Sequence, residues 1–240
     1  MRIFPWYLNN IWRGLVRRVH KKFVRFLWSK NTIVSRSLVK MSRKRIVVTR
    51  ELNFYSDYIR LAAFELCAHE IRRHNISGAT AEVGVYRGNF AKKINEAFPD
   101  KILYLFDTFN GFTDHELKED LEGGLAQDKK FVSVTPEAVL AIMPYPEKCK
   151  IKVGPFDKTS LEHVLSFAFV SLDVDLYRPT IEGLRAFWEK LSPGGYIFVH
   201  DYNNDDWGGI KKAVDEFRKE NRAVVVPLPD AHGSVIISKP

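Results

Sequence analysis

The chain has 240 residues, of which 45% are hydrophobic, enough for one domain with a sizeable core and a short appendage. Its two cysteines, Cys67 and Cys149, exclude a disulfide-stapled scaffold and lack metal-type spacing, so we expect a reducing compartment and a cytoplasmic location. No apolar run approaches the roughly 20 residues that span a bilayer. Arginines interrupt the first thirty residues, which argues against a signal peptide.

The net charge of +8 comes from the first fifty residues. Of the 37 Lys and Arg residues, 14 lie between Met1 and Arg50, a stretch without Asp or Glu. The rest of the chain is net acidic, with 23 basic against 29 acidic groups. We expect no nucleic-acid partner, because an acidic domain repels phosphates.

Apolar residues recur at intervals of three and four from Ile11 to Leu27 and predict an amphipathic helix with a basic face. Such a helix either contacts an anionic membrane surface through residues 1–40 or packs its apolar stripe on the domain or in a homodimer. We therefore predict a basic helical extension, residues 1–50, ahead of one α/β domain, residues 51–240. A membrane-peripheral location would follow from the first of these alternatives.

From Glu51 onward, short apolar runs alternate with helical periodicity, the pattern of βαβ units and a parallel sheet. Only the connection from Leu228 to Gly233 is too short for a crossover helix, so the last two strands form an antiparallel hairpin. We predict a Rossmann-like α/β fold, with a seven-stranded, mostly parallel sheet and helices on both faces. The predicted strands are Thr80–Val85, Ile102–Phe106, Cys149–Val153, Phe167–Leu172, Tyr196–His200, Arg222–Pro227 and Ser234–Ser238. The predicted helices are Tyr55–His74, Asn89–Phe98, Pro136–Ile142, Pro179–Leu191 and Gly208–Asn221.

The first predicted strand leads into a glycine-containing turn. The spacing of Gly84 and Gly88 permits close backbone approach to a ligand, but it is not the GxGxxG of dinucleotide binders, so we infer a nucleoside ligand without phosphates. Glu82 is an acid in a buried strand and needs a cationic or hydroxyl partner. Asp107, at the tip of the second strand, is where Rossmann-like folds hold ribose hydroxyls. A plain turn and a capping carboxylate are the alternatives.

Two later strands end in metal-capable side chains. Asp173 and Asp175 follow one buried strand, and His200 and Asp201 follow the next. The carboxyl ends of parallel strands share one edge of the sheet, so we expect Asp173, His200 and Asp201 to converge on one ion. These ligands suit Mg²⁺ or Mn²⁺ better than structural zinc. The alternative is that His200 orients an acid or serves as a base.

With these residues the chain resembles the macrocin O-methyltransferase family, which includes mycinamicin and novobiocin sugar O-methyltransferases. The resemblance runs from about Tyr55 to the end of the sequence. It rests on ordered motifs at Glu82–Gly88, Leu105–Phe112, Val153–Thr159, Leu172–Thr180, His200–Tyr202 and Gly209–Phe217. It implies that residues 51–240 form a class I methyltransferase domain that uses S-adenosylmethionine and magnesium to methylate a hydroxyl of a sugar or glycoside.

The resemblance implies that Asp173 and Asp201 are metal ligands, with Asp175 as a supporting or substrate-facing acid. The family's usual pair of acids is here His200 and Asp201, which leaves the third ligand and the identity of the metal open. A divalent ion chelated by vicinal hydroxyls would orient the acceptor and lower its pKa, and Asp175, His200 or His232 would take the proton. The residues expected to bind the cofactor are Glu82, Gly84, Tyr86, Gly88, Asn89, Asp107, Thr108, Phe156 and Asp173.

Two other functions compete with this one. Asp173-Val174-Asp175 is formally the DxD metal motif of nucleotide-sugar glycosyltransferases, but the glycine turn and Asp107 would then lack roles. The other is a non-catalytic protein whose basic N-terminus binds membranes or polyanions. The intact candidate ligands at the two strand ends argue against this function. The acidic stretch Gly111–Asp128 is expected to be a lid over the substrate or a plain surface loop.

Overall fold

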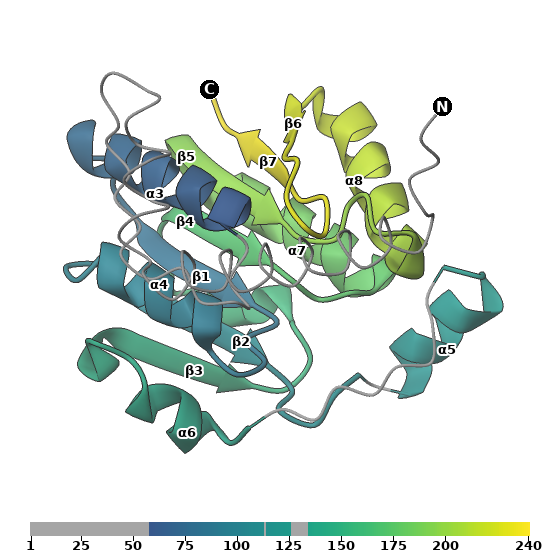
Figure 1. Cartoon of the computed structure of the whole chain (residues 1–240), viewed down its shortest axis with the longest axis horizontal. Helices are drawn as coiled ribbons and strands as arrows, with labels where there is room; N and C mark the ends of the chain where they lie inside the picture. The colour runs from purple at the N-terminus through teal and green to yellow at the C-terminus, as the bar shows by residue number, and fades with distance from the viewer. Residues whose placement is uncertain (1–57, 113, 126–133) are drawn as a thin grey trace, which may run out of the picture. The chain divides into compact units, whose positions relative to one another are not determined.

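The computed structural model of the chain describes residues 58–112, 114–125 and 134–240. The chain divides into two compact units, residues 1–62 and 63–240, and the second contains the whole sheet (Figure 1). The predicted helix from Ile11 to Leu27 and the boundary after residue 50 lie outside the described residues and stay predictions. None of the helices that the structure describes is both long and apolar enough to cross a membrane.

Seven strands form one sheet in the order β3-β2-β1-β4-β5-β7-β6. The first five strands of the chain run parallel, and β7 is antiparallel to both of its neighbours, β5 and β6. The predicted Rossmann-like sheet with its C-terminal antiparallel hairpin is therefore confirmed. The strands are β1 (Ala79–Val83), β2 (Leu103–Asp107), β3 (Cys149–Val153), β4 (Phe167–Leu172), β5 (Leu191–Val199), β6 (Val225–Pro227) and β7 (Val235–Ser238).

Helices cover both faces of the sheet (Figure 1). Phe64 of α3 and Phe98, directly after α4, pack against Phe169 of the central strand β4 on one face. On the other face Phe187 of α7 packs against Phe167, and α8 lies beside α7. The helices are α3 (Tyr58–Arg73), α4 (Asn89–Ala97), α5 (Asp114–Glu122), α6 (Pro136–Ala141), α7 (Tyr177–Lys190) and α8 (Gly208–Asn221). Short 3₁₀ turns are η1 (Pro146–Lys148), η2 (Lys158–Leu161) and η3 (Asp205–Trp207).

Strand β4 supplies aromatic side chains to both faces, although Phe167 and Phe169 are two residues apart. Side chains at that spacing point the same way in a regular strand. Here the pairing of β4 with β1 and with β5 shifts register within this segment, as in a β-bulge. The shift explains how Phe167 packs against α7 while Phe169 packs against α3. All six residues of β4 are buried, so this strand is the centre of the core.

The structure corrects two predicted strand starts and adds one helix. Strand β5 starts at Leu191 and not at Tyr196, because Leu191 already pairs with Phe167 ahead of the glycine turn. Strand β6 starts at Val225, because α8 ends on Arg222 in the left-handed conformation, with φ 51°. The stretch expected to be a lid or surface loop contains helix α5. Sequence periodicity missed this helix because its polar composition draws only a weak apolar stripe.

The central aromatic packing gives a stability prediction. Phe169→Ala removes a side chain with no exposed surface, and we expect the free energy of unfolding to fall by about 3–5 kcal/mol, because the lost contacts leave a cavity. Leu165→Ala is the control, since Leu165 is 97% exposed and its truncation should change stability by about 0.5 kcal/mol or less. Denaturant unfolding measures both variants. Equal stabilities would contradict the assigned core.

Candidate active site

The glycine turn between β1 and α4 brings two strand ends into direct backbone contact. Gly84 has φ +82°, and a Cβ built on it would lie 1.8 Å from the carbonyl oxygen of Asp173. The Asp173 N–H donates to the Val83 carbonyl at 2.9 Å, which closes the same contact from the other side. Only glycine fits here, because it accepts a positive φ and has no side chain. The sequence interpretation of a tight turn at Gly84 agrees with this geometry.

The carboxylate of Asp107 holds this turn in place. Its Oδ2 accepts the N–H groups of Val85 and Tyr86 at 2.7 and 2.8 Å, and its Oδ1 accepts the Phe109 N–H at 2.7 Å. Hydrogen bonds to an ionised acceptor are about twice as strong as neutral ones. Asp107 therefore ties the end of β2 to the turn after β1. Asp107 thus has a role in shaping the turn, and its contact with a ribose stays a prediction.

The other residues expected to bind the cofactor fall into two groups. Near the turn, Glu82 lies buried in β1, Gly88 is the N-cap of α4 with φ +74°, and Asn89 begins that helix. Tyr86 is 40% exposed in the turn itself. The second group has partners within the protein: the Thr108 hydroxyl donates to the Gly111 carbonyl, and Phe156 stacks on Phe187 of α7 at 5.3 Å. Cofactor contacts of both groups stay predictions.

The three predicted metal ligands meet at the ends of β4 and β5. The His200 Nδ1 lies 3.0 Å from the Asp173 Oδ1 and 2.5 Å from the Asp201 Oδ2. One ligand atom from each residue lies within 4.8 Å of the others, a spacing at which they could hold a metal ion. Asp201 is buried and has φ 58°, in the left-handed region. The expected convergence of Asp173, His200 and Asp201 is thus present, while metal binding itself stays a prediction.

Sequence reasoning missed Asn204. Its side-chain Nδ2 donates to the Asp201 Oδ1 at 2.7 Å, and its Oδ1 accepts the Asp206 N–H at the start of η3. The carboxylate of Asp201 is therefore oriented, with one oxygen toward Asn204 and the other toward His200. The signal in the sequence was the N-cap pattern Asn204-Asp205-Asp206, which predicts a helical turn directly after the cluster.

The hairpin between β6 and β7 brings His232 to the cluster. The Asn203 N–H donates to the Gly233 carbonyl at 3.0 Å, and a Cβ on Gly233 would lie 2.5 Å from the Cβ of Asn203. This docking places the His232 Nδ1 3.5 Å from the Asp201 Oδ1. The rings of His200 and His232 are 5.0 Å apart between centroids. The third candidate base, Asp175, lies outside the cluster of three.

Asp175 occupies an unusual backbone conformation. Its φ is 61°, and the N–H of the next residue, Leu176, donates to the Val174 carbonyl at 2.7 Å, which closes a three-residue γ-turn around Asp175. A non-glycine residue in this region costs of the order of 1–3 kcal/mol, and such residues concentrate at functional sites.

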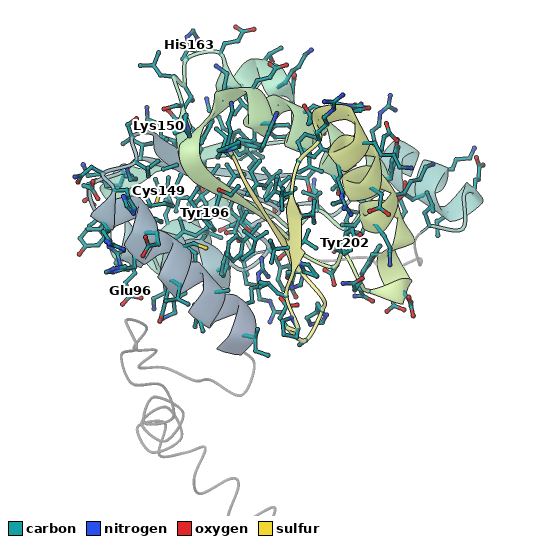
Figure 2. All side chains as sticks on the ribbon, turned by 90° about the horizontal axis from the view of Figure 1, so that it is seen from above. Glu96, Cys149, Lys150, His163, Tyr196 and Tyr202 are labelled. Atoms are coloured by element: carbon teal, nitrogen blue, oxygen red, sulfur yellow. The ribbon has the colours of Figure 1, made fainter. Side chains whose placement is uncertain are left out.

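Tyr202 follows the cluster and lies beside α8 (Figure 2). Burial, together with the hydrogen bond that its hydroxyl donates to the Asp215 Oδ1 at 2.8 Å, raises the pKa of Tyr202 above its ordinary value. The hydroxyl therefore stays protonated at neutral pH. Tyr202 is thus a hydrogen-bond donor to α8, and the Lys211 ammonium lies over its ring.

Comparison with known proteins now decides the family. The family described as Macrocin-O-methyltransferase (TylF) matches residues 56–233, most of the chain and all of the site. The chain belongs to this family. Its resemblance on motifs is thereby confirmed, and the motifs at the glycine turn and at both strand ends lie inside the matched region.

Comparison with individual proteins also finds O-methyltransferases. The chain is 29% identical over 177 residues to demethyldecarbamoylnovobiocin O-methyltransferase of Streptomyces niveus, a match that covers 66% of this chain and 65% of that protein. It is 26% identical over 183 residues to mycinamicin III 3''-O-methyltransferase of Micromonospora griseorubida, covering 66% and 67%. The matched region thus spans about two thirds of the length of these relatives.

Solved structures share the fold. The O-methyltransferase NovP superposes with a TM-score of 0.59 at 22% identity, over 75% of this chain and 79% of that chain. The calicheamicin methyltransferase CalS11 superposes with a TM-score of 0.62 at 19% identity, over 87% and 92%. The Rossmann-like architecture is therefore common to this chain and to these methyltransferases.

The backbone contact at Gly84 gives a second prediction. Gly84→Ala should destabilise the protein by several kcal/mol, because the new methyl group meets the Asp173 carbonyl oxygen in a packed region. Gly124→Ala is a matched control: Gly124 also has a positive φ, +65°, but nothing lies within 4 Å of its Cβ position, so only the conformational cost of about 1–2 kcal/mol applies. Thermal unfolding compares the two. Similar losses would show that the close contact is unimportant.

Proposed function

We propose that this chain transfers the methyl group of S-adenosylmethionine to a hydroxyl of a sugar or glycoside, with a divalent metal held by Asp173, His200 and Asp201. The observation that carries the proposal is the backbone contact between Gly84 and Asp173. It places the turn expected to hold the nucleoside directly beside the acids expected to hold the acceptor. Family membership and the O-methyltransferase names of the relatives support the same reaction.

The residues present fit a divalent ion. Two carboxylates and one imidazole converge, Asp201 is buried, and Asn204 fixes the direction of its carboxylate. Two oxygens and one nitrogen suit Mn²⁺ as well as Mg²⁺. When bound, such an ion lowers the pKa of a coordinated hydroxyl and orients it.

The protein's part in the reaction is alignment and proton removal. Methyl transfer breaks the carbon–sulfur bond of the sulfonium and forms a carbon–oxygen bond, so acceptor oxygen, methyl carbon and sulfur must lie in line. The two strand ends hold the reactants against each other for this purpose. The acceptor's proton passes to a base, and S-adenosylhomocysteine leaves. If His200 serves as a ligand, the base is Asp175, held by its γ-turn, or His232, beside Asp201.

The same geometry argues against the glycosyltransferase alternative. It would use Asp173 and Asp175 as a pair, but the acids that come together with His200 are Asp173 and Asp201. It also gives no role to Asp107, whose carboxylate organises the glycine turn.

The reaction is tested with labelled substrate. S-adenosylmethionine carrying a labelled methyl group is incubated with purified protein, Mg²⁺ and a panel of glycosides and nucleotide-linked deoxysugars with vicinal hydroxyls. We expect label in a methyl ether and an equal amount of S-adenosylhomocysteine. Matched acceptors that lack one of the two hydroxyls should react far more slowly, because chelation needs both. Release of nucleoside diphosphate without methylation would favour the glycosyltransferase instead.

Metal dependence gives a further prediction. Asp173→Asn and Asp201→Asn should each remove most turnover, because these acids hold the ion. In Asp201→Asn the S-adenosylmethionine affinity, measured by calorimetry, should change little, whereas Asp173 is also expected to contact the cofactor. EDTA should remove most turnover of the wild type, and Mn²⁺ should restore it. Asp205→Asn is the control, since Asp205 is an exposed acid next to the cluster but outside it. Full turnover in EDTA would reject the metal and leave the methyltransferase proposal standing.

A further inference from the structure

Helices α7 and α8 begin without a capping side chain of their own. The N-cap residues are Leu176 and Trp207, whose side chains cannot accept a hydrogen bond. The first N–H groups of a helix have no partner within the helix and need one from elsewhere. Both helices begin close to the candidate active site, α7 just after Asp175 and α8 after the loop that carries Asp201.

Both partners come from the end of α5. The Asp120 Oδ2 accepts the N–H of Tyr177, the first residue of α7, at 2.8 Å. The Leu125 carbonyl accepts the N–H of Gly209 in the first turn of α8 at 3.2 Å. The segment from Asp120 to Leu125 therefore caps two helices that lie far away in the sequence.

The end of α5 is shaped for this task. Leu125 N–H donates to the Asp120 carbonyl and Gly124 N–H to the Leu121 carbonyl, with Gly124 at φ +65°, which is a Schellman ending. This turn sends the Leu125 carbonyl toward α8. A side chain at Gly209 would lie 2.5 Å from the Asp120 Oδ2, so the glycine leaves room for the carboxylate.

The charge of Asp120 favours the neighbouring helices and not its own helix. An acid in the last turn of a helix opposes the dipole of that helix, which is unfavourable for α5 itself. At the first turns of α7 and α8 the same charge is favourable. Asp120 is also 2% exposed, and burying a carboxylate is costly unless donors compensate for it.

We propose that Asp120 is a positioning residue for the methyl transfer: by capping α7, and with Leu125 linking α7 to α8, it fixes the two strand-end loops that carry Asp173, Asp175 and Asp201. This inference rests on the proposed function. The strained γ-turn at Asp175 ends one residue before the N–H that Asp120 holds, so the cap prevents the turn from relaxing. The segment from Asp120 to Leu125 thus takes part in the site through the starts of α7 and α8.

The test compares three variants. Asp120→Ala removes the acceptor, Asp120→Asn keeps one acceptor oxygen, and Glu122→Ala is the control, an acid of the same helix that is exposed and paired with Lys118 on the surface at 3.6 Å. Each protein is examined for Mn²⁺ affinity by electron paramagnetic resonance, for S-adenosylmethionine affinity by calorimetry, and for amide hydrogen exchange.

For Asp120→Ala we expect Mn²⁺ to bind about 10–100-fold more weakly, the usual effect of removing a group that supports metal ligands indirectly. Amide exchange should accelerate in the first turns of α7 and α8, while S-adenosylmethionine affinity stays within about twofold because its turn is held by Asp107. Asp120→Asn should recover part of both losses, and Glu122→Ala should match the wild type. If Asp120→Ala does not fold, Asp120→Asn decides by the same two quantities.

Three results would overturn the proposal: unchanged Mn²⁺ affinity in Asp120→Ala, equal losses in Glu122→Ala, or a loss of S-adenosylmethionine affinity as large as that of Mn²⁺, which would indicate general damage. A wild type that binds no Mn²⁺ contradicts the proposed metal site instead. Hydrogen exchange then decides for Asp120: acceleration confined to the two helix starts supports the positioning role, and acceleration across the sheet rejects it.

Discussion

The site depends on how closely the ends of β1 and β4 approach each other. At Gly84 the backbone of one strand end touches the carbonyl of Asp173 on the other, with no side chain between them. This is the point in the strand order where the chain changes direction across the sheet, since β2 and β3 lie on one side of β1 and β4 and β5 on the other. Ligands of open α/β sheets bind at such points. This contact brings the glycine turn and the end of β4 together at that point.

Around that contact, several carboxylates accept hydrogen bonds from backbone N–H groups, besides the ligand contacts expected of some of them. Asp107 accepts N–H groups from the glycine turn, and Asp120 accepts one from the start of α7. Asp201 instead accepts a hydrogen bond from the side-chain amide of Asn204. Loops at the edge of a sheet have many unpaired backbone donors, and an ionised acceptor satisfies several of them strongly. Asp107, Asp120 and Asp201 therefore have a structural role in the loops at this edge of the sheet.

Sequence alone predicted the sheet, its hairpin and the meeting of Asp173, His200 and Asp201, because buried parallel strands leave continuous apolar runs whose ends must share an edge. It did not predict where β5 begins, since Ser192 to Gly195 have the composition of a turn and pairing decides their conformation. It also missed α5, although Gly123 and Gly124 are a helix-ending signal.

The N-cap pattern at Asn204 predicts a helical turn but not the contact with Asp201. For Asp120 the sequence has no signal, because its partner lies 57 positions away. Polar residues in loops and short helices have no periodicity from which such a partner can be inferred. Local patterns find the elements of this fold, and long-range hydrogen bonds decide how the loops between them are arranged.

The placement of β7 has a consequence for how the protein is made. This strand is synthesised after β6, yet it lies between β6 and β5 and pairs with both. Until β7 pairs, β5 is an edge strand whose backbone groups from Tyr196 to Val199 lack the partners that β7 provides, and such edges pair wrongly with other chains. The loop with His200 and Asp201 also reaches its final arrangement only when the β6–β7 hairpin docks on it. The candidate site is therefore complete only after β7 has taken its place between β5 and β6.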